Sequence, residues 1–187
     1  VYLVHGTCQF CGTPKTNQML LHIMGLHLPG ASFVHPNTPL RDAITAQTTR
    51  RAVQMTDISG NSTPIGHIIN EKAIVNGLVG LMATGGSTNL TIHMIAIAAA
   101  AGIIINWDDF SDIAEVVPLI CRIYPNGVSD INHFHAAGGM SYLIRELIDS
   151  KLVHTDVKTV AGDGGLIAYT LEPMKNTHAE PDAVLYR

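Results

Sequence analysis

Two cysteines lie three residues apart near the start of the chain, in the segment 6–12 (GTCQFCG), just before a predicted helix. A thiolate before a helix N-terminus is stabilised by free backbone amides and by the positive end of the helix dipole. Cys8 and Cys11 could therefore act as metal ligands, nucleophiles or redox thiols. A zinc site would need a second ligand pair, and the sequence offers only scattered histidines. Burial of both cysteines as small apolar residues is the alternative.

A glycine-rich segment, 83–89 (ATGGSTN), is the second candidate site. Its two glycines permit close backbone approach, and Ser87 or Thr88 can cap the helix that follows. Free amides at Gly86, Ser87, Thr88 and Asn89 could hold an anion such as phosphate, carboxylate or cluster sulfide. The segment lacks the GxGxxG pattern and the Walker lysine, so nucleotide binding is disfavoured. A plain glycine turn with a helix cap is the alternative.

Other polar residues favour structural roles. The segment 106–112 (NWDDFSD) could hold a hard cation, but capping of a short helix by Asp109 or Ser111 explains it more simply. The chain has 10 histidines without a tight ligand pair, and for each a hydrogen-bonded structural role is expected. His133 and His135 could reach a substrate from a loop-to-helix boundary. Cys121, in an apolar run, is predicted to belong to the core.

The elements that must position these residues are mostly helices. Threonine–proline pairs predict helix starts at Thr13-Pro14, ending near Gly25, and at Thr38-Pro39, reaching Met55. Helical spacing of apolar residues predicts further helices around 74–82 and 140–148. The segment 90–101 is apolar on nearly every side, which predicts a helix that is buried all round and ends at Gly102. The runs 31–34 and 103–105 are predicted short strands. The pattern indicates a helix-rich α/β fold.

Composition narrows the class of protein. The 187 residues carry a formal net charge of -4, so the chain lacks the positive charge with which proteins bind the phosphates of nucleic acid. The longest apolar stretch is too short for a membrane span. Three cysteines are too few for a disulfide scaffold, which favours a cytoplasmic location. No linker divides residues 1–187, which we interpret as a single partial domain. The start at Val1 and the polar tail suggest an internal piece of a longer enzyme.

A series of motifs across residues 5–173 resembles the dihydroxy-acid and 6-phosphogluconate dehydratase family. In order along the chain they are GTC at 6–8, GT at 12–13, TNQM at 16–19, MGLHLPG at 24–30, PNTPLRDA at 36–43, NEKA at 70–73, GGSTN at 85–89, NWDDF at 106–110, YPNG at 124–127, DINHF at 130–134 and AAGG at 136–139. Within the family, the TNQ, NWDDF and INHF runs resemble the 6-phosphogluconate branch.

The resemblance implies the later part of a helix-rich α/β amino-terminal domain. It implies an Entner–Doudoroff hydro-lyase that converts 6-phospho-D-gluconate, a sugar-acid phosphate, to 2-dehydro-3-deoxy-6-phospho-D-gluconate and water. By position, Cys8 matches a ligand of a 4Fe-4S cluster, whereas Cys11 matches no family ligand. A divalent cation such as Mg²⁺ or Mn²⁺ commonly binds near the substrate carboxylate in the family. No nucleic acid or membrane partner is expected, and the full-length protein is expected to be a homodimer.

The family's other cluster cysteines are expected upstream of Val1, and its catalytic serine base beyond Arg187, so we expect the isolated chain to be inactive. Two departures from the family pattern are Pro14-Lys15, which places a charge near the cysteine loop, and Leu90, where many relatives have histidine. By charge, phosphate could be held by Arg41, Lys72 and Arg145, with surface or ion-pair roles as the alternative.

Three rival functions remain open. The first is a dehydratase of the same family that acts on a dihydroxy acid or another sugar acid. The second is a non-catalytic remnant that folds without chemistry. The third is a zinc or thiol-redox module built on Cys8 and Cys11, which would leave the other motifs unexplained.

Overall fold

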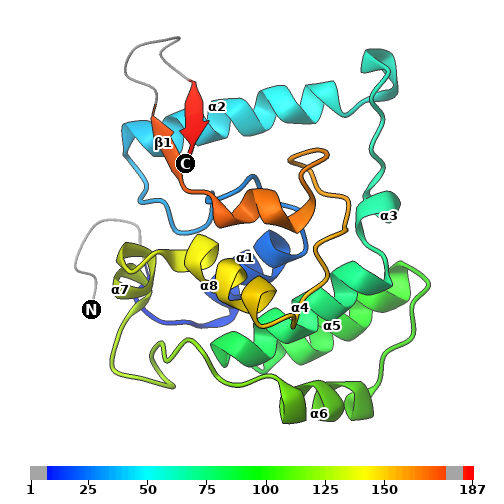
Figure 1. Ribbon diagram of the computed structural model, residues 1–187, viewed down its shortest axis with the longest axis vertical. Coiled ribbons are helices and arrows are strands. Elements are labelled where there is room, and N and C mark those ends of the chain that lie inside the picture. The colour runs from blue at the N-terminus through cyan, green and yellow to red at the C-terminus, as the bar shows by residue number, and fades with distance from the viewer. Residues whose placement is uncertain (1–7, 176–182) are drawn as a thin grey trace.

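The computed structural model describes residues 8–175 and 183–187 as a helical assembly with a small sheet at one end (Figure 1). Its elements, in chain order, are α1 (Thr13–Ile23), α2 (Pro39–Gln54), η1 (Asp57–Ser59), α3 (Ile65–Ile68), α4 (Glu71–Thr84), α5 (Asn89–Ala100), α6 (Trp107–Val116), α7 (Ile131–Ala136), α8 (Gly139–Asp149), η2 (Gly165–Thr170), β1 (Pro173–Lys175) and β2 (Val184–Tyr186). The two strands are antiparallel, with Met174 opposite Leu185. The fold is therefore helix-rich with a minor sheet, as the sequence predicts.

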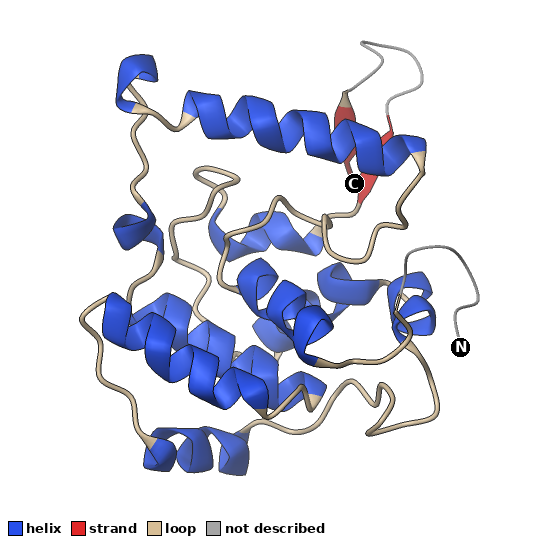
Figure 2. Ribbon diagram, turned by 180° about the vertical axis from the view of Figure 1, so that it is seen from behind, coloured by secondary structure: helices blue, strands red, loops and turns tan. Residues whose placement is uncertain are grey.

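The elements lie in three tiers, which both ribbon views show (Figures 1 and 2). Helix α2 and the strands lie at one end, α4, α5 and α6 at the other, and α1, α8 and η2 between them. Figure 2 shows helix as the dominant structure in every tier. The middle tier carries the fully buried side chains of Leu20, Ile23, Leu143 and Tyr169. Apolar burial therefore joins elements from both ends of the sequence into one core.

Close contact between α1 and α4 depends on two glycines. A Cβ added at Gly77 would lie 3.2 Å from Cγ of Met24, and one at Gly80 would lie 3.0 Å from Cγ2 of Ile23. Side chains at these positions would push the helices apart, so glycine sets their spacing at the centre of the core.

Several helix boundaries agree with the sequence predictions. Thr38 caps α2 as predicted, by accepting a hydrogen bond from the amide of Arg41. Asn70, for which the sequence predicted no cap, caps α4 by accepting a hydrogen bond from the amide of Ala73. Gly102 follows α5 in the left-handed conformation, with φ of 76°. The helices predicted around 74–82 and 140–148 are α4 and α8.

Other local predictions were wrong. The segments 31–34 and 103–105 are loops and turns instead of strands, because neither finds a partner strand. Helix α5 is not buried all round, since Leu90, Met94 and Ala98 are buried but Ile92 is 64% exposed. The first helix starts one residue early, with Gly12 as its cap residue.

The described residues contain no helix that is both long enough and apolar enough to cross a membrane. Part of the cysteine motif, Gly6 and Thr7, lies outside the described residues, as do His5 and His178.

Candidate functional site

The cysteine loop packs against the segment that leads into α7. The amide of Cys11 donates to the carbonyl of Tyr124 at 3.0 Å, and the amide of Ile131 donates to the carbonyl of Gln9 at 3.1 Å. The rings of Phe10 and Tyr124 lie 5.0 Å apart between centroids. Two motifs that are more than a hundred residues apart in sequence therefore form one surface.

The glycine-rich loop joins the same surface through the first turn of α1. The amide of Ser87 donates to Oγ1 of Thr16 at 3.0 Å, and Nδ2 of Asn89 donates to Oγ1 of Thr13 at 2.6 Å. The hydroxyls of Thr13 and Ser87 lie 3.1 Å apart. A Cβ at Gly86 would come within 3.0 Å of Oγ1 of Thr16, so only glycine permits this approach.

A third contact joins the glycine-rich loop to the segment before α7, because Nδ2 of Asn126 donates to the carbonyl of Gly85. The sequence predicted only a helix start at Thr13 and no role for Thr16 or Asn126, although all three lie within the motifs that carry the family resemblance. Their hydrogen bonds span 41 to 76 residues of sequence, so no local spacing could have revealed them. We call the surface formed by loops 8–12, 85–89 and 124–130 the motif surface.

Most amides of the glycine-rich loop are already used within the chain. The amide of Gly86 donates to the carbonyl of Leu81 at 3.3 Å, that of Ser87 donates to Thr16, and that of Asn89 donates to Oγ of Ser87 at 3.3 Å. Thr88 and Asn89 are exposed on the motif surface. Anion binding at residues 86–89 stays a prediction, and these exposed side chains are the groups that would carry it.

The two neighbouring cysteines occupy opposite environments. Cys8 is exposed, whereas Cys11 is 3% exposed, and its Sγ lies 3.8 Å from Oγ1 of Thr16 and 4.0 Å from Sδ of Met19. Burial raises the pKa of Cys11, and it raises the pKa of Cys121 to about 12. All three thiols are free. Only Cys8 presents its sulfur at the surface as a ligand would.

A paired zinc site at Cys8 and Cys11 finds no support in this geometry. No group of three or more His, Cys, Asp or Glu side chains within the described part of the chain could hold a metal ion. The zinc module therefore lacks a ligand set within residues 8–175 and 183–187.

Lys15 lies in the first turn of α1, directly after the cysteine loop. Burial lowers the pKa of Lys15, and the nearby thiol of Cys8 opposes that shift. The Lys15 ammonium lies 5.6 Å from the centroid of the Phe33 ring, which holds the side chain in place. The charge that the sequence predicts near the cysteine loop is therefore held against the ring of Phe33.

Helix α7 begins with a capping box. Oδ1 of Asp130 accepts hydrogen bonds from the amides of Asn132 at 2.9 Å and His133 at 3.0 Å, and the ring of His133 accepts one from the amide of Asp130. These backbone hydrogen bonds lower the pKa of Asp130. His133 thus orders the helix start, and His135 instead lines a separate cavity of about 170 Å³ near Glu172.

The segment 106–112 also forms a helix cap. Oδ1 of Asn106 accepts hydrogen bonds from the amides of Asp108 and Asp109, and Oδ2 of Asp109 accepts one from the amide of Asn106. The predicted structural role is confirmed, although Asn106 is the cap residue and Asp109 its partner. Ser111 is not the cap.

A buried histidine network fixes the loop after α1. His22 is fully buried; its Nδ1 lies 3.0 Å from Oγ of Ser32, and its Nε2 accepts a hydrogen bond from the amide of Gly30. His27 also contacts Ser32, at 3.2 Å. Burial lowers the pKa of His22 to about 3, so the ring is neutral. The structural role expected for histidines is confirmed at His22.

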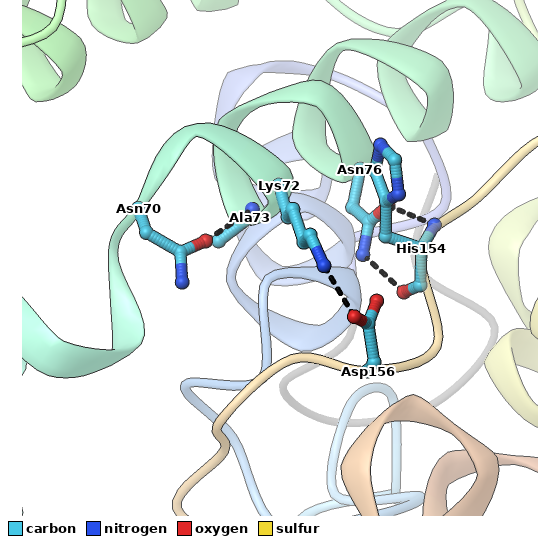
Figure 3. Close-up of polar contacts among 6 residues, drawn as sticks. All are labelled: Asn70, Lys72, Ala73, Asn76, His154 and Asp156. Atoms are coloured by element: carbon cyan, nitrogen blue, oxygen red, sulfur yellow. Dashed lines mark hydrogen bonds and ion pairs between the residues drawn. The ribbon is translucent and has the colours of Figure 1, made fainter.

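The three cations considered for phosphate all make contacts within the fold. Arg41 donates to the carbonyl of Ala31 at 3.1 Å, and Arg145 donates to that of Thr170 at 2.8 Å. Lys72 forms an ion pair with Asp156, next to buried Asn76 (Figure 3). These contacts support the alternative of surface and ion-pair roles. Leu90 is fully buried.

Comparison with known proteins matches the chain to one family. The family described as "Dihydroxy-acid/6-phosphogluconate dehydratase N-terminal" matches residues 1–165. The chain is 60% identical over 172 residues to a phosphogluconate dehydratase of Pseudomonas aeruginosa and 59% identical over 175 residues to one of Escherichia coli K12. These alignments cover 92% and 94% of this chain but 28% and 29% of the relatives.

A more distant relative is a dihydroxy-acid dehydratase of a Synechococcus species, 34% identical over 157 residues, or 84% of this chain and 28% of that protein. The chain thus spans little more than a quarter of the length of the curated relatives it matches. A family match over most of the chain establishes its membership. The chain belongs to the dihydroxy-acid/6-phosphogluconate dehydratase family.

Proposed function

We propose that this chain is part of a longer polypeptide that dehydrates 6-phospho-D-gluconate to 2-dehydro-3-deoxy-6-phospho-D-gluconate and water, in the Entner–Doudoroff pathway. The observation that carries the proposal is the identity of 60% and 59% to proteins named phosphogluconate dehydratase, against 34% to a dihydroxy-acid dehydratase.

The proposed cofactor is a 4Fe-4S cluster, with Cys8 as one ligand. A cluster is held by several thiolates, and the chain fits this in part, since Cys8 is exposed while Cys11 is buried against α1. The other ligands would come from another part of the polypeptide. When bound, such a cluster supplies an open iron that polarises the substrate hydroxyl and eases its departure.

The chain's own contribution is to position ligand and substrate. The hydrogen bond from Ile131 to Gln9 and the one from Cys11 to Tyr124 hold both sides of the loop next to Cys8. The exposed side chains of Thr88 and Asn89 can hydrogen-bond the hydroxyl and carboxylate groups of a sugar acid. Asn89 is itself oriented by Thr13, which would fix the direction of that contact.

Removal of the C2 proton needs a base that we place outside this chain. A divalent cation such as Mg²⁺ or Mn²⁺ near the substrate carboxylate would need ligands from the same outside region. The isolated chain is therefore proposed to be inactive, and the longer polypeptide is proposed to be a cytoplasmic homodimer. Three free thiols agree with a reducing compartment.

The first test is to read the coding DNA on both sides of the segment. An upstream Cys-Asp-Lys motif and a downstream serine-bearing domain in frame would support a working enzyme. Anaerobic assay of that full-length protein should then show turnover of 6-phosphogluconate that exceeds turnover of an unphosphorylated dihydroxy acid. Stop codons on both sides would mean a non-catalytic remnant, and preference for the dihydroxy acid would assign the other branch of the family.

Two cysteine variants of the full-length protein test the ligand assignment. Cys8→Ala should abolish both the brown iron–sulfur absorbance and the turnover. Cys11→Ala is the matched control and should keep the cluster, because its sulfur faces α1. A cluster retained in Cys8→Ala, or lost in a folded Cys11→Ala, would contradict the assignment.

A further inference from the structure

The hydroxyl of Thr16 lies where the cysteine loop and the glycine-rich loop of the motif surface meet. Its Oγ1 lies 3.0 Å from the carbonyl oxygen of Gly12, in the cysteine loop, and 3.0 Å from the amide of Ser87, in the glycine-rich loop. Thr16 is 1% exposed, so water does not share in either contact. A single hydroxyl therefore joins the two loops directly.

The chemistry of these groups fixes the direction of each hydrogen bond. The amide of Ser87 can only donate, so Oγ1 of Thr16 accepts from it. The carbonyl of Gly12 can only accept, so the one hydroxyl proton of Thr16 is donated there. Sγ of Cys11 lies 3.8 Å from the same oxygen, on the buried side of the cysteine loop. A valine at position 16 would have nearly the same shape but could make none of these contacts.

The methyl group of Thr16 faces the glycine-rich loop as well. A Cβ added at Gly86 would overlap Cγ2 of Thr16 and would lie 3.0 Å from its Oγ1. The absence of a side chain at Gly86 lets the loop come close enough for the next amide, that of Ser87, to reach the hydroxyl. Thr16 and Gly86 together therefore set how closely the glycine-rich loop approaches α1.

We propose that Thr16 is a positioning residue, which holds the glycine-rich loop in register with the cysteine loop. The groups that it places relative to one another are the exposed thiol of Cys8 and the exposed side chains of Thr88 and Asn89. Thr16 is buried and acts only through these groups. The consequence for turnover rests on the proposed function, whereas the register of the two loops is a property of the 187-residue chain itself.

Register matters because the two loops have different tasks in the proposed reaction. Cys8 is the proposed cluster ligand, and Thr88 and Asn89 are the proposed substrate contacts. A displacement of about 1 Å between groups that act together can cost about a hundredfold in rate. Loss of the Thr16 hydroxyl should therefore impair turnover by more than its effect on stability explains.

The first test measures the register in the 187-residue chain by NMR. A nitroxide attached to the exposed thiol of Cys8 broadens the signals of nearby groups, and the signals to follow are the amide of Thr88 and the Nδ2 group of Asn89. The broadening falls steeply with distance, so we expect it to change in Thr16→Val. Exchange of the Ser87 amide with solvent should be about fivefold faster, as the loss of one hydrogen bond implies. Thr16→Ser keeps the hydroxyl and should resemble the unchanged chain in both measurements.

Thr159→Val is the matched control. Thr159 is 2% exposed, and its Oγ1 also contacts two backbone groups, because it accepts from the amide of Ala161 at 3.2 Å and donates to the carbonyl of Gly162 at 3.4 Å. None of these residues belongs to the motif surface. Thr159→Val should lower the urea midpoint about as much as Thr16→Val does, and it should leave the broadening and the Ser87 exchange unchanged.

The second test measures turnover in the full-length protein. In Thr16→Val, kcat/KM for 6-phosphogluconate should fall about tenfold or more, while the brown iron–sulfur absorbance is retained. Thr16→Ser should restore most of the loss, and Thr159→Val should leave kcat/KM unchanged. Preference for a dihydroxy acid would contradict the proposed function, and the same comparison of variants would then be made with that substrate.

A compensating pair of substitutions tests the contact from the other loop. Gly86→Ala should disturb the register as Thr16→Val does, because the added Cβ meets Cγ2 of Thr16. Serine lacks that methyl group, so the double variant Thr16→Ser, Gly86→Ala should recover much of the broadening pattern that Gly86→Ala loses. Losses that simply add in the double variant would contradict a direct contact between the two positions.

Three results would overturn the proposal. They are an unchanged broadening pattern in folded Thr16→Val, changes of equal size in Thr159→Val, and no advantage of Thr16→Ser over Thr16→Val. A changed register with an unchanged kcat/KM would refute the positioning role in the reaction. An inactive full-length protein without substitutions would contradict the proposed function alone, because the NMR comparison does not depend on turnover.

Discussion

Replacement of Asn76 should reveal how the tier of α4 is joined to the chain that follows α8. Asn76 is fully buried, and its side chain makes two hydrogen bonds to the backbone of a single residue (Figure 3). Its Nδ2 donates to the carbonyl of His154 at 2.9 Å, and its Oδ1 accepts from the amide of His154 at 2.8 Å. Asn76→Ala removes both bonds and leaves two backbone groups without partners.

The expected loss follows from these two contacts. Each lost hydrogen bond costs about 1 kcal/mol, and an unpaired group that water does not reach adds more, so Asn76→Ala should cost about 2–4 kcal/mol. With a urea dependence of about 2 kcal/mol per M for a small protein, the unfolding midpoint should fall by about 1–2 M. Urea titration followed by circular dichroism at neutral pH measures both the midpoint and the slope.

Lys72→Ala is the matched control, because it lies one turn earlier on α4 and joins the same segment through its ion pair with Asp156. The pair is exposed, with side-chain accessibilities of 45% and 67%, so water screens it and its loss should shift the midpoint little. A midpoint for Asn76→Ala within error of that for Lys72→Ala would refute the argument that burial, rather than the number of contacts, decides the cost.

Three further perturbations have defined outcomes. The pKa of His22 falls from 6.5 to about 3 on folding, so the unfolded chain binds the extra proton and stability should fall by about 2.5 kcal/mol between pH 7 and pH 4.5. Urea titrations of His22→Gln should show a weaker pH dependence. Gly25→Ala should destabilise more than Gly102→Ala in the same assay: both glycines have positive φ, but only at Gly25 would a Cβ meet Thr159, at 2.7 Å from Cγ2. Iodoacetamide should label Cys8 well before the buried Cys11 in the native protein, as mass spectrometry would show.

Each of these has a contradicting result. An unchanged pH dependence in folded His22→Gln would mean that other groups govern acid unfolding. Equal losses in the two glycine variants would mean that backbone strain alone matters at Gly25. Equal labelling of the two cysteines would mean that the start of α1 opens readily in solution.

Local rules predicted much of the helical framework. Thr38 starts its helix through a hydrogen bond from a residue three positions along, so the neighbouring sequence contains all the necessary information. The apolar spacing in α4 and α8 likewise requires only one face to be buried. The motifs that resemble the dehydratase family are also contiguous, and the family match confirms that resemblance.

Burial and strand pairing could not be predicted in the same way. The β-branched run 103–105 has strand propensity, but it has no neighbour to pair with and forms a loop. Helix α5 is apolar on nearly every side, yet only the stripe of Leu90, Met94 and Ala98 is buried. Which face of such a helix is buried depends on where the other elements pack. A helix that is apolar on every side gives no pattern from which that face could be predicted.

In the candidate site, too, some features could be predicted from the sequence and others could not. The sequence by itself determined that Cys8, Cys11 and the glycine-rich loop are chemically capable groups. Only the tertiary structure decided that Cys8 faces out while Cys11 packs against Thr16, and that Asn89 reaches Thr13 across 76 residues of sequence. The physical reason is the sequence separation of the contacts involved. Helix caps depend on contacts within one turn, whereas the exposure of a thiol depends on side chains that folding brings from distant parts of the chain.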